Sequence, residues 1–318
     1  MPDVSVIIPT YNRSHFVKEA IESALQQSYV DFEVLVIDDG STDDTRLVVE
    51  SISDPRIKYC YKDNGGQSSA RNLGLVKAKS KYVAYLDSDD LWSSDYLETM
   101  VRQLDANEDY GAVYTRIISL HSDGRREELS KPEHYRSGWI TKYFFDSMAY
   151  LAPLATCFRK FVCEDIFWDE ALRRDEDYDF FLRISTKTQF LFVPDAYAIK
   201  RAHAGSFSSE VTPIGAIDGA HILERFYFHF GGDKYVSLRA ARRKISHRYR
   251  KAAKIARALG NRDAAILLFK KAMSYYPTDI RLYLDLLRAS LKSKQSDTLH
   301  DWQMPEPLPP YITVKQKS

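Results

Sequence analysis

Three stretches decide the fold: VSVIIPTYNR (4–13), EVLVIDDG (33–40) and YVAYLDSDD (82–90). Each begins as a short apolar run rich in β-branched residues and ends in polar side chains. Apolar runs of this length, stopped by proline, glycine or acidic residues, are typical of buried β-strands. The sequence therefore predicts three buried strands, each followed by a polar loop.

Segments with helical spacing separate these strands. Apolar residues between 16 and 25 recur every three or four positions, Ser14 is placed to cap that helix, and a further helix is expected over 68–78. Strands that alternate with helices at this interval predict an α/β fold with a mostly parallel sheet. In such sheets the carboxyl ends of the strands form the ligand crevice, so we expect the polar loops to converge there.

The most acidic of these loops is Asp87-Ser88-Asp89-Asp90. Three carboxylates in four residues repel one another unless a cation lies between them, and a divalent ion carrying phosphates is a natural partner. The alternative is a solvated acidic turn that caps the next helix at Asp90 or Ser93.

The other two loops have side chains suited to a nucleotide. Asp39 could accept hydrogen bonds from a ribose or a base, and Gly40 lets the backbone approach a ligand closely. Tyr11 could present its ring to a nucleobase. Taken alone, the loop that contains Asp39 and Gly40 also fits an ordinary turn that precedes a helix cap. Elsewhere in the chain, Trp139 and Trp168 could stack on sugar rings, with ordinary packing as the alternative.

Four motifs in order resemble the family 2 glycosyltransferases, which have the GT-A fold. They are VSVIIPTYNR (4–13), VLVIDDGSTDDT (34–45), GGQSSARNLGL (65–75) and YVAYLDSDD (82–90), and the resemblance covers residues 3–205. It implies a Rossmann-like, mostly parallel sheet flanked by helices. It also implies transfer of a hexose or N-acetylhexosamine from a UDP-sugar to an acceptor hydroxyl of a glycan or glycolipid, with inversion.

The resemblance also assigns roles to residues. Uracil and ribose would lie against Pro9, Tyr11 and Asp39, Arg71 would lie near the phosphates or the base, and Asp87 would face ribose and sugar. Asp89 and His203 would bind Mn²⁺ or Mg²⁺, although a structural role is the alternative for His203. The full set expected to bind the donor nucleotide and sugar is Pro9, Thr10, Tyr11, Arg13, Asp39, Gly66, Arg71, Asp87 and Ser88.

An acidic segment, Arg174-Asp-Glu-Asp-Tyr-Asp179, precedes an apolar helical run that ends near Arg183. By resemblance, Asp177 is the general base that deprotonates the acceptor, and Glu176 binds the acceptor. Asp175 and Asp179 are expected to share a helix face, and Arg183 to fix the helix through an ion pair. The alternative for the segment is an acidic first turn favoured by the helix dipole.

Bulk composition excludes some classes of function. The chain has 45 basic and 44 acidic residues, so a net charge of +1 gives no reason to expect nucleic-acid binding. Three scattered cysteines predict reduced thiols in a cytoplasmic protein. We expect neither a signal peptide nor a membrane span. The basic stretch 239–254 is either a solvated helix face or a peripheral contact with the inner face of an anionic membrane or with the phosphorylated lipid carrier of a lipid-linked glycan.

The expected domains are a GT-A domain (1–213), a helical extension (214–299) and a proline-rich tail (300–318). The extension resembles one tetratricopeptide unit at Gly260, Ala265, Phe269, Ala272 and Pro277. One such unit cannot bury its apolar face alone, so it would pack on the catalytic domain or on another subunit in a homo-oligomer. The alternative function is a non-catalytic nucleotide-sugar-binding scaffold whose helical tail binds partners.

Overall fold

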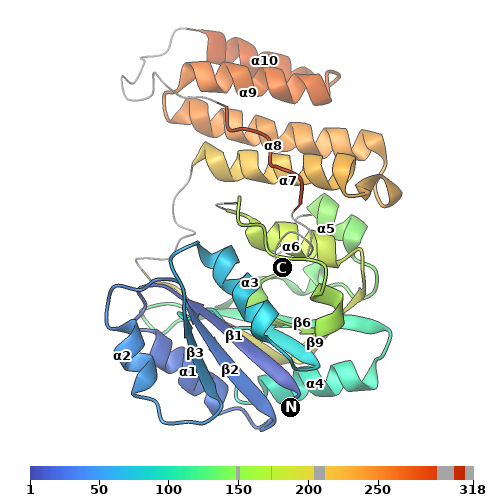
Figure 1. The fold of residues 1–318 in the computed structure, drawn as a ribbon. Coiled ribbons are helices and arrows are strands. Elements are labelled where there is room, and N and C mark those ends of the chain that lie inside the picture. The colour runs from blue at the N-terminus through green and yellow to red at the C-terminus, as the bar shows by residue number, and fades with distance from the viewer. Residues whose placement is uncertain (148–150, 173, 204–211, 292–303, 312–318) are drawn as a thin grey trace. The chain divides into compact units, whose positions relative to one another are not determined.

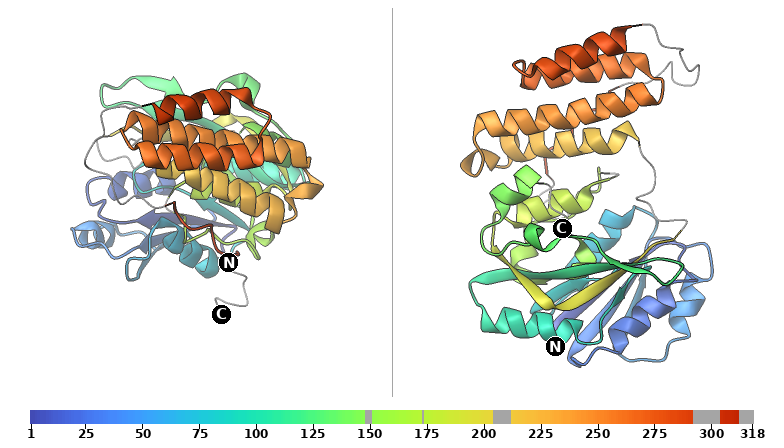
Figure 2. Two further views of the ribbon diagram at one scale, coloured as in Figure 1. Left: turned by 90° about the horizontal axis from the view of Figure 1, so that it is seen from above. Right: turned by 180° about the vertical axis from the view of Figure 1, so that it is seen from behind.

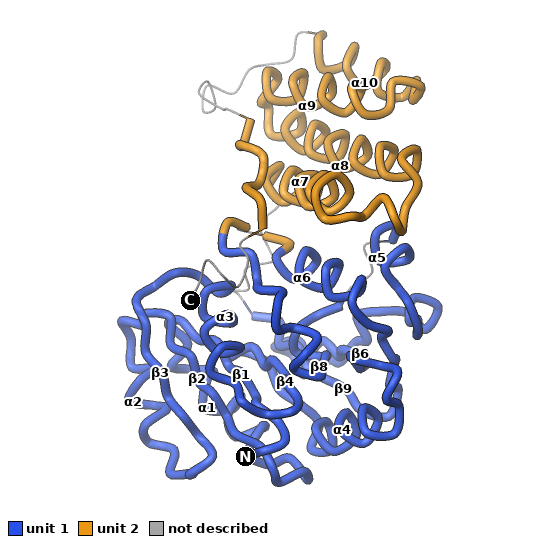
Figure 3. Tube along the Cα trace, turned by 45° about the vertical axis from the view of Figure 1, so that its right-hand side comes forward, with its two compact units in different colours: residues 1–170, 176–206, 312–318 blue, residues 171–175, 207–311 orange. Residues whose placement is uncertain are grey.

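The computed structural model describes residues 1–147, 151–172, 174–203, 212–291 and 304–311 (Figure 1). The chain divides into two compact units, shown in different colours in Figure 3. Of the described residues, those up to 170 and those in 176–203 belong to unit 1, and residues 171–172, 174–175, 212–291 and 304–311 belong to unit 2. Most of the expected proline-rich tail lies outside the described residues, which include only 304–311 of it.

Unit 1 contains a large sheet and the helices that cover it. Its strands are β1 (Val4–Thr10), β2 (Phe32–Asp38), β3 (Ile57–Tyr61), β4 (Tyr82–Tyr85), β5 (Leu91–Trp92), β6 (Tyr110–Leu120), β7 (Arg126–Glu128), β8 (Thr156–Arg159) and β9 (Gln189–Arg201). Its α-helices are α1 (Val17–Leu25), α2 (Thr45–Glu50), α3 (Gln67–Lys77), α4 (Tyr96–Ala106), α5 (Thr141–Ser147) and α6 (Glu176–Ile184). Short 3₁₀ turns lie at Pro132–His134, Pro153–Ala155 and Lys160–Cys163.

The strand order is β3-β2-β1-β4-β8-β6-β9-β5, with β7 paired to β6. The first four strands are parallel, as the three sequence stretches predict. Beyond β4 the sheet is mixed, because β8 runs antiparallel to both β4 and β6, and β6 runs parallel to β9. The α/β fold with a Rossmann-like parallel half is therefore confirmed (Figure 1).

Helices cover both faces of the sheet. Val4, Val6 and Ile8 of β1 share one core with α1 and α4, whereas Ile7 faces α3. Successive strand residues point to opposite faces, so a strand covered on both faces must be apolar at nearly every position. This explains why every residue of β1 and β2 is buried. In the other half of the sheet, α4 lies along β6 and β9 (Figure 2).

Helix α3 packs unusually close to β1. A Cβ atom at Gly74 would lie 2.4 Å from Cγ2 of Ile7, so no larger residue fits without a shift of the helix. Arg71 lies one turn before Gly74 in the same helix and is itself buried. Gly74 therefore lets α3 pack close to β1, and this close packing keeps Arg71 buried.

Some local expectations are wrong. Helix α1 begins at Val17 with Phe16, not Ser14, at its N-cap position, and Ser14 instead bonds Asp43 through its N–H, at 3.1 Å, and through its side chain. The sequence pattern does not predict strand β9, because Pro194 interrupts its apolar residues. The structure accommodates that proline in a bulge between Val193 and Tyr197.

Unit 2 is helical. It contains α7 (Pro213–His229), a 3₁₀ turn at Gly232–Lys234, α8 (Leu238–Ala258), α9 (Arg262–Tyr275) and α10 (Ile280–Ser290), and each helix packs on the next. Between α8 and α9, Gly260 adopts a positive φ of 81°, and Asn261 caps α9 by accepting from the N–H of Ala264 at 3.0 Å. No helix in the described part of the chain is long and apolar enough to cross a membrane.

Part of the basic stretch 239–254 is held within unit 2. Arg250 pairs with Asp285 at 2.7 Å, and Arg248 donates to Asp175 at 2.8 Å and to the carbonyl of Gly215 at 3.1 Å. The guanidinium of Arg248 fills the space over Gly219, where a Cβ atom would lie 1.9 Å from Nη2. These two arginines are therefore committed to internal contacts.

Candidate functional site

The polar loops that follow β1, β2, β3 and β4 lie at the same edge of the parallel half of the sheet, because parallel strands end on the same side. The loop after β1 is joined to the loop after β2. The N–H of Asn12 donates to Ser41 at 2.9 Å, and Asn12 Oδ1 accepts from the N–H of Thr42 at 2.8 Å. The two loops are thus held as one surface.

Asp43 strengthens this connection between the loops. Its carboxylate accepts from the N–H of Ser14 at 3.1 Å and from the N–H of Thr45 at 3.0 Å. Burial alone would raise the pKa of Asp43, but the hydrogen bonds from Thr45 and Ser14 lower it to about 2. The carboxylate is therefore ionised throughout the neutral range.

Asp39 is buried at the centre of these loops. Its Oδ1 accepts from Nζ of Lys62 at 2.6 Å and from the N–H of Gly65 at 3.0 Å, and its Oδ2 accepts from the N–H of Gly66 at 2.7 Å. An ionised carboxylate only accepts, so one acceptor position on Oδ2 is left in these contacts. Sequence reasoning missed Lys62, although this residue directly follows β3 and so had to reach the same edge.

Three more residues that are expected to bind the donor, Pro9, Thr10 and Tyr11, lie at the end of β1 and directly after it. Pro9 and Thr10 are buried in β1, and the carbonyl of Thr10 accepts from the N–H of Asp39 at 2.9 Å. The hydroxyl oxygen of Thr10 is buried without a hydrogen-bond partner among the described residues. The side chain of Tyr11 is 46% exposed. A buried polar atom without a partner and a half-exposed ring fit a ligand that covers this surface.

Arg71 joins the acidic loop after β4 to the acidic start of α6. It donates to Asp87 at 2.8 Å and to Glu176 at 3.2 Å, and its guanidinium lies 4.4 Å from the ring centre of Trp168. Its side chain is only 3% exposed. Burial alone would lower the pKa of Arg71, but Asp87 and Glu176 offset this effect and raise it. Arg71 therefore brings together the loop at Asp87 and the start of α6, although Glu176 lies 105 residues from Arg71 in the sequence.

Asp89 lies in a second cluster with the predicted metal ligand His203. Oδ2 of Asp89 is 3.1 Å from Nε2 of His203 and 3.5 Å from Nε of Arg13. Within the described residues, no group of three or more His, Cys, Asp or Glu side chains converges as a metal site. Asp89 and His203 nevertheless supply oxygen and imidazole donors side by side, a pair that suits Mn²⁺, and Asp87 lies in the same loop.

The other residues of this loop are buried. Ser88 is buried, and Asp90 accepts from the N–H of Arg201 at 3.0 Å. Burial first, and then the charges of Asp87 and Asp89, raise the pKa of Asp90 well above its ordinary value. The side chain of Arg201 donates to the carbonyl of Asp89 and to Glu19, so it stabilises the loop from outside.

Helix α6 presents Glu176 and Asp177 in its first turn. Asp177 accepts from the N–H of Tyr178 at 2.7 Å, and its charge also helps to raise the pKa of Arg71. Arg183 pairs with buried Asp179 at 2.9 Å, which confirms the expected ion pair. Asp175 does not share the face of Asp179, because it lies before the helix with a positive φ of 57°.

The two tryptophans considered as sugar platforms differ. Trp168 is buried, donates to the hydroxyl of Tyr85 at 3.1 Å, and stacks on Phe180 with ring centres 4.0 Å apart. Trp139 is exposed. Trp168 therefore packs in the core and supports Arg71.

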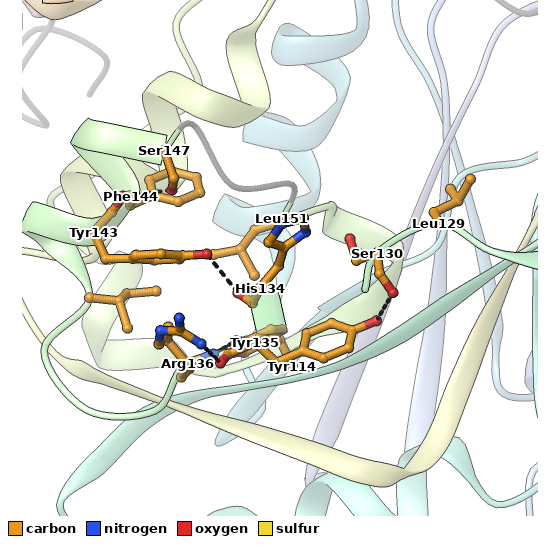
Figure 4. Close-up of a pocket in the computed structure, with 11 residues that line it drawn as sticks. Tyr114, Leu129, Ser130, His134, Tyr135, Arg136, Tyr143, Phe144, Ser147 and Leu151 are labelled. Carbon is orange, nitrogen blue, oxygen red and sulfur yellow. Dashed lines mark hydrogen bonds between the residues drawn. The ribbon is translucent and has the colours of Figure 1, made fainter. Parts of the chain in front are cut away.

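A separate cavity of about 240 Å³ lies in unit 1 among β6, α5 and the segment between β7 and α5 (Figure 4). Aromatic rings of Tyr114, Tyr135, Tyr143 and Phe144 form much of its wall. Sequence reasoning does not single out this cavity, because its residues carry no recognisable motif.

Curated relatives match somewhat more than half of the chain. An uncharacterized glycosyltransferase of Rickettsia felis is 37% identical over 195 residues, which cover 58% of this chain but only 30% of that protein. Chondroitin synthase of Pasteurella multocida is 33% identical over 199 residues, 60% of this chain and 20% of that protein. Succinoglycan biosynthesis protein ExoO of Rhizobium meliloti is 34% identical over 191 residues, 56% of this chain and 54% of that protein. The matched region is thus about a third or less of the length of the first two proteins and about half of the third.

Solved structures share the fold over most of the chain. TarS of S. aureus in complex with UDP has a TM-score of 0.57 at 21% identity, with 88% of each chain covered. The mannosyltransferase PcManGT of Pyrobaculum calidifontis, in complex with GDP-Man and Mn²⁺, has a TM-score of 0.53 at 20% identity, with 91% of this chain and 86% of that chain covered. The family model "Glycosyl transferase family 2" matches residues 5–169, which include the four loops at the sheet edge. This chain therefore belongs to the family 2 glycosyl transferases.

Proposed function

We propose that the protein is a metal-dependent, inverting glycosyltransferase that transfers a hexose or N-acetylhexosamine from a UDP-sugar to a hydroxyl group of a glycan or glycolipid. The bridge from Arg71 to Asp87 and Glu176 carries this proposal. It brings the expected donor-binding loop and the expected acceptor-binding helix to one guanidinium, which is the arrangement that direct transfer requires.

The contacts of Asp39 support a uracil base. Its one remaining acceptor position on Oδ2 suits a base with a ring N–H, such as N3–H of uracil. Cytosine has an unprotonated N3 acceptor there, so it would face the carboxylate unfavourably. Guanine also has a ring N–H, and the choice of UDP over GDP follows the resemblance to TarS, which was solved with UDP and with UDP-GlcNAc.

The metal ion would be Mn²⁺ or Mg²⁺, held by Asp89 and His203, with Asp87 facing the ribose and sugar. Such an ion supplies charge neutralisation on the diphosphate leaving group. Arg13, at 3.5 Å from Asp89, would contribute further positive charge beside the phosphates. The remaining donor contacts would come from Pro9, Thr10, Tyr11, Gly66 and Ser88.

Asp177 would act as the base that removes the proton of the acceptor hydroxyl while that oxygen attacks the anomeric carbon. Attack from the face opposite the diphosphate inverts the anomeric centre. Glu176 would orient the acceptor, and Arg71 holds it in place for that task. In this proposal residues 1–213 form the catalytic domain, and residues 214–299 form a helical extension with a tetratricopeptide-like hairpin.

Calorimetric titration of UDP, CDP, GDP and dTDP, with Mn²⁺ and then with EDTA, tests the donor proposal. UDP should bind in the presence of Mn²⁺, and CDP should bind about 10- to 100-fold more weakly because it lacks the ring N–H. Asp39→Asn should reduce this discrimination. Failure of every nucleotide to bind would contradict the proposal.

Turnover of UDP-sugars tests the base. Asp177→Asn should abolish transfer and leave UDP affinity unchanged, whereas Asp109→Asn, at an exposed position outside the site, should affect neither. If the wild-type protein binds UDP with Mn²⁺ but turns over no UDP-sugar with any acceptor, the non-catalytic scaffold becomes the better explanation.

A further inference from the structure

The cavity beside α5 has the size of a site for a single sugar ring. Its volume of about 240 Å³ is below the range of about 300–1,000 Å³ that is usual for sites of drug-sized ligands (Figure 4). It lies in the mixed half of unit 1, and none of its lining residues belongs to the four loops at the parallel edge. The nucleotide would therefore bind elsewhere, and this cavity is left for another ligand.

The walls of the cavity are fixed by hydrogen bonds of the tyrosine hydroxyl groups. Tyr114 donates to the carbonyl of Arg136 at 2.8 Å and accepts from the N–H of Arg136 at 2.7 Å. Tyr143 donates to the carbonyl of His134 at 3.0 Å. Because the hydroxyl groups hold the segment in place, the aromatic rings are the part of these tyrosines that can contact a ligand.

The rim of the cavity is polar. The guanidinium of Arg136 lies 4.9 Å from the ring centre of Tyr143, and the side chain of Arg136 is exposed. His134 is exposed too, and its ring makes no hydrogen bond or ion pair with any described residue. Rigid apolar rings with polar donors around them match a pyranose, whose ring carbons present C–H groups and whose edge carries hydroxyls. A hydrocarbon chain has no group that could accept hydrogen bonds from these donors.

The cavity is connected to the helix of the proposed base. Phe144 forms part of the cavity wall, and its ring packs against that of Tyr178 with centres 5.1 Å apart. Tyr178 is buried and directly follows Asp177 in α6. A ligand in the cavity would therefore lie beside the helix that carries the proposed base.

We propose that this cavity is a saccharide subsite, which binds one sugar ring of the acceptor through the faces of Tyr143 and its aromatic neighbours. The inference rests on the proposed function, and it assigns to the acceptor a binding surface outside the motifs of the donor site. The rim donors Arg136 and His134 would bind the hydroxyls of that ring.

Saturation-transfer difference NMR on the full chain with UDP and Mg²⁺ tests the subsite. The probes are methyl α- and β-glycosides of glucose, galactose, mannose and N-acetylglucosamine. At least one should receive saturation on its ring protons. Tyr143→Ala should lower its affinity about 5- to 10-fold, whereas Tyr143→Phe, which keeps the ring and loses only the hydrogen bond to His134, should retain most of it.

Two further variants separate binding from folding. Leu129→Trp places bulk at an exposed position of the cavity wall and should block the glycoside without affecting the core. Phe161→Ala removes an exposed aromatic ring of unit 1 that does not line the cavity, and it should change nothing.

Three outcomes would overturn the subsite: no glycoside receives saturation, glycoside binding persists in both Tyr143→Ala and Leu129→Trp, or only the alkyl chain of dodecyl maltoside is saturated. Titration of UDP into the same samples distinguishes the two proposals. Absence of glycoside binding with intact UDP binding contradicts the subsite alone, whereas failure of UDP to bind contradicts the proposed function.

Discussion

Replacement of Arg71 by methionine should destabilise unit 1 strongly. The change leaves Asp87 and Glu176 without the cation that lies 2.8 and 3.2 Å from them. Removal of one partner from a buried ion pair costs about 3–5 kcal/mol. Because the two carboxylate side chains are still 19% and 18% exposed, water compensates part of the loss, and we expect about 3 kcal/mol.

Urea unfolding, followed by tryptophan fluorescence, measures this loss. Trp92 and Trp168 are buried in unit 1, so their emission reports on that unit. With a urea dependence of about 2–3 kcal/mol per M, the midpoint should fall by about 1 to 1.5 M. Arg71→Lys keeps the charge but cannot bind both carboxylates and stack on Trp168, so it should recover only part of the stability.

Arg46→Met is the matched control, because Arg46 also pairs with a carboxylate, Glu50 at 2.8 Å, but on the exposed surface. Its midpoint should equal that of the wild type. A midpoint for Arg71→Met within about 0.2 M of the wild type would refute the idea that the bridge stabilises unit 1. A fully stable Arg71→Lys would refute the importance of the guanidinium fork.

Three further predictions concern other parts of the chain. Gly219→Ala should lower the stability of unit 2 by about 1–3 kcal/mol in a calorimetric melt, because the new Cβ atom would lie 1.9 Å from a guanidinium nitrogen of Arg248. Gly215→Ala is the control and should be tolerated, because its nearest contact would be 3.3 Å away. Asp43→Asn should cost about 1 kcal/mol at pH 7, because solvent screening reduces the effect of its pKa of about 2. The folded-state pKa is lowered, so this difference in urea midpoint should be present above pH 4 and disappear as the pH falls towards 2; a constant difference would contradict it. Ellman's reagent should label one thiol, Cys60, in the native protein and three thiols after unfolding. Burial protects Cys157 and Cys163 and raises the pKa values of their thiols. Rapid labelling of all three thiols in the native protein would disprove this burial.

The parallel half of unit 1 could be predicted from the sequence because its signals are local. Strands β1 and β2 are covered on both faces, so nearly every residue is apolar, and each strand ends in polar residues. The mixed half gives weaker signals. Strand β9 contains a proline that looks like a strand breaker, and it is accommodated only because a bulge interrupts the pairing with β6.

The same distinction applies to the candidate site. Asp39, Asp87 and Asp89 can be found because each follows a predicted strand. The contact between Arg71 and Glu176 depends on how α6 packs, and no spacing in the sequence predicts it. The cavity wall likewise forms from β6, α5 and the segment before α5, whose tyrosines look like ordinary core residues until they are seen together.

The bridge at Arg71 also limits how this protein can be recombined with its relatives. A chimera that joins residues 1–110 of this chain to the half of another family member that carries its equivalent of α6 would cut between Arg71 and its partner Glu176. The half taken from the relative must then have a carboxylate at the start of its equivalent of α6. Otherwise Arg71 will be buried with Asp87 as its only acidic partner from this pair. Exchange of acceptor preference by domain shuffling therefore has to treat Arg71 and Glu176 as a single inherited pair.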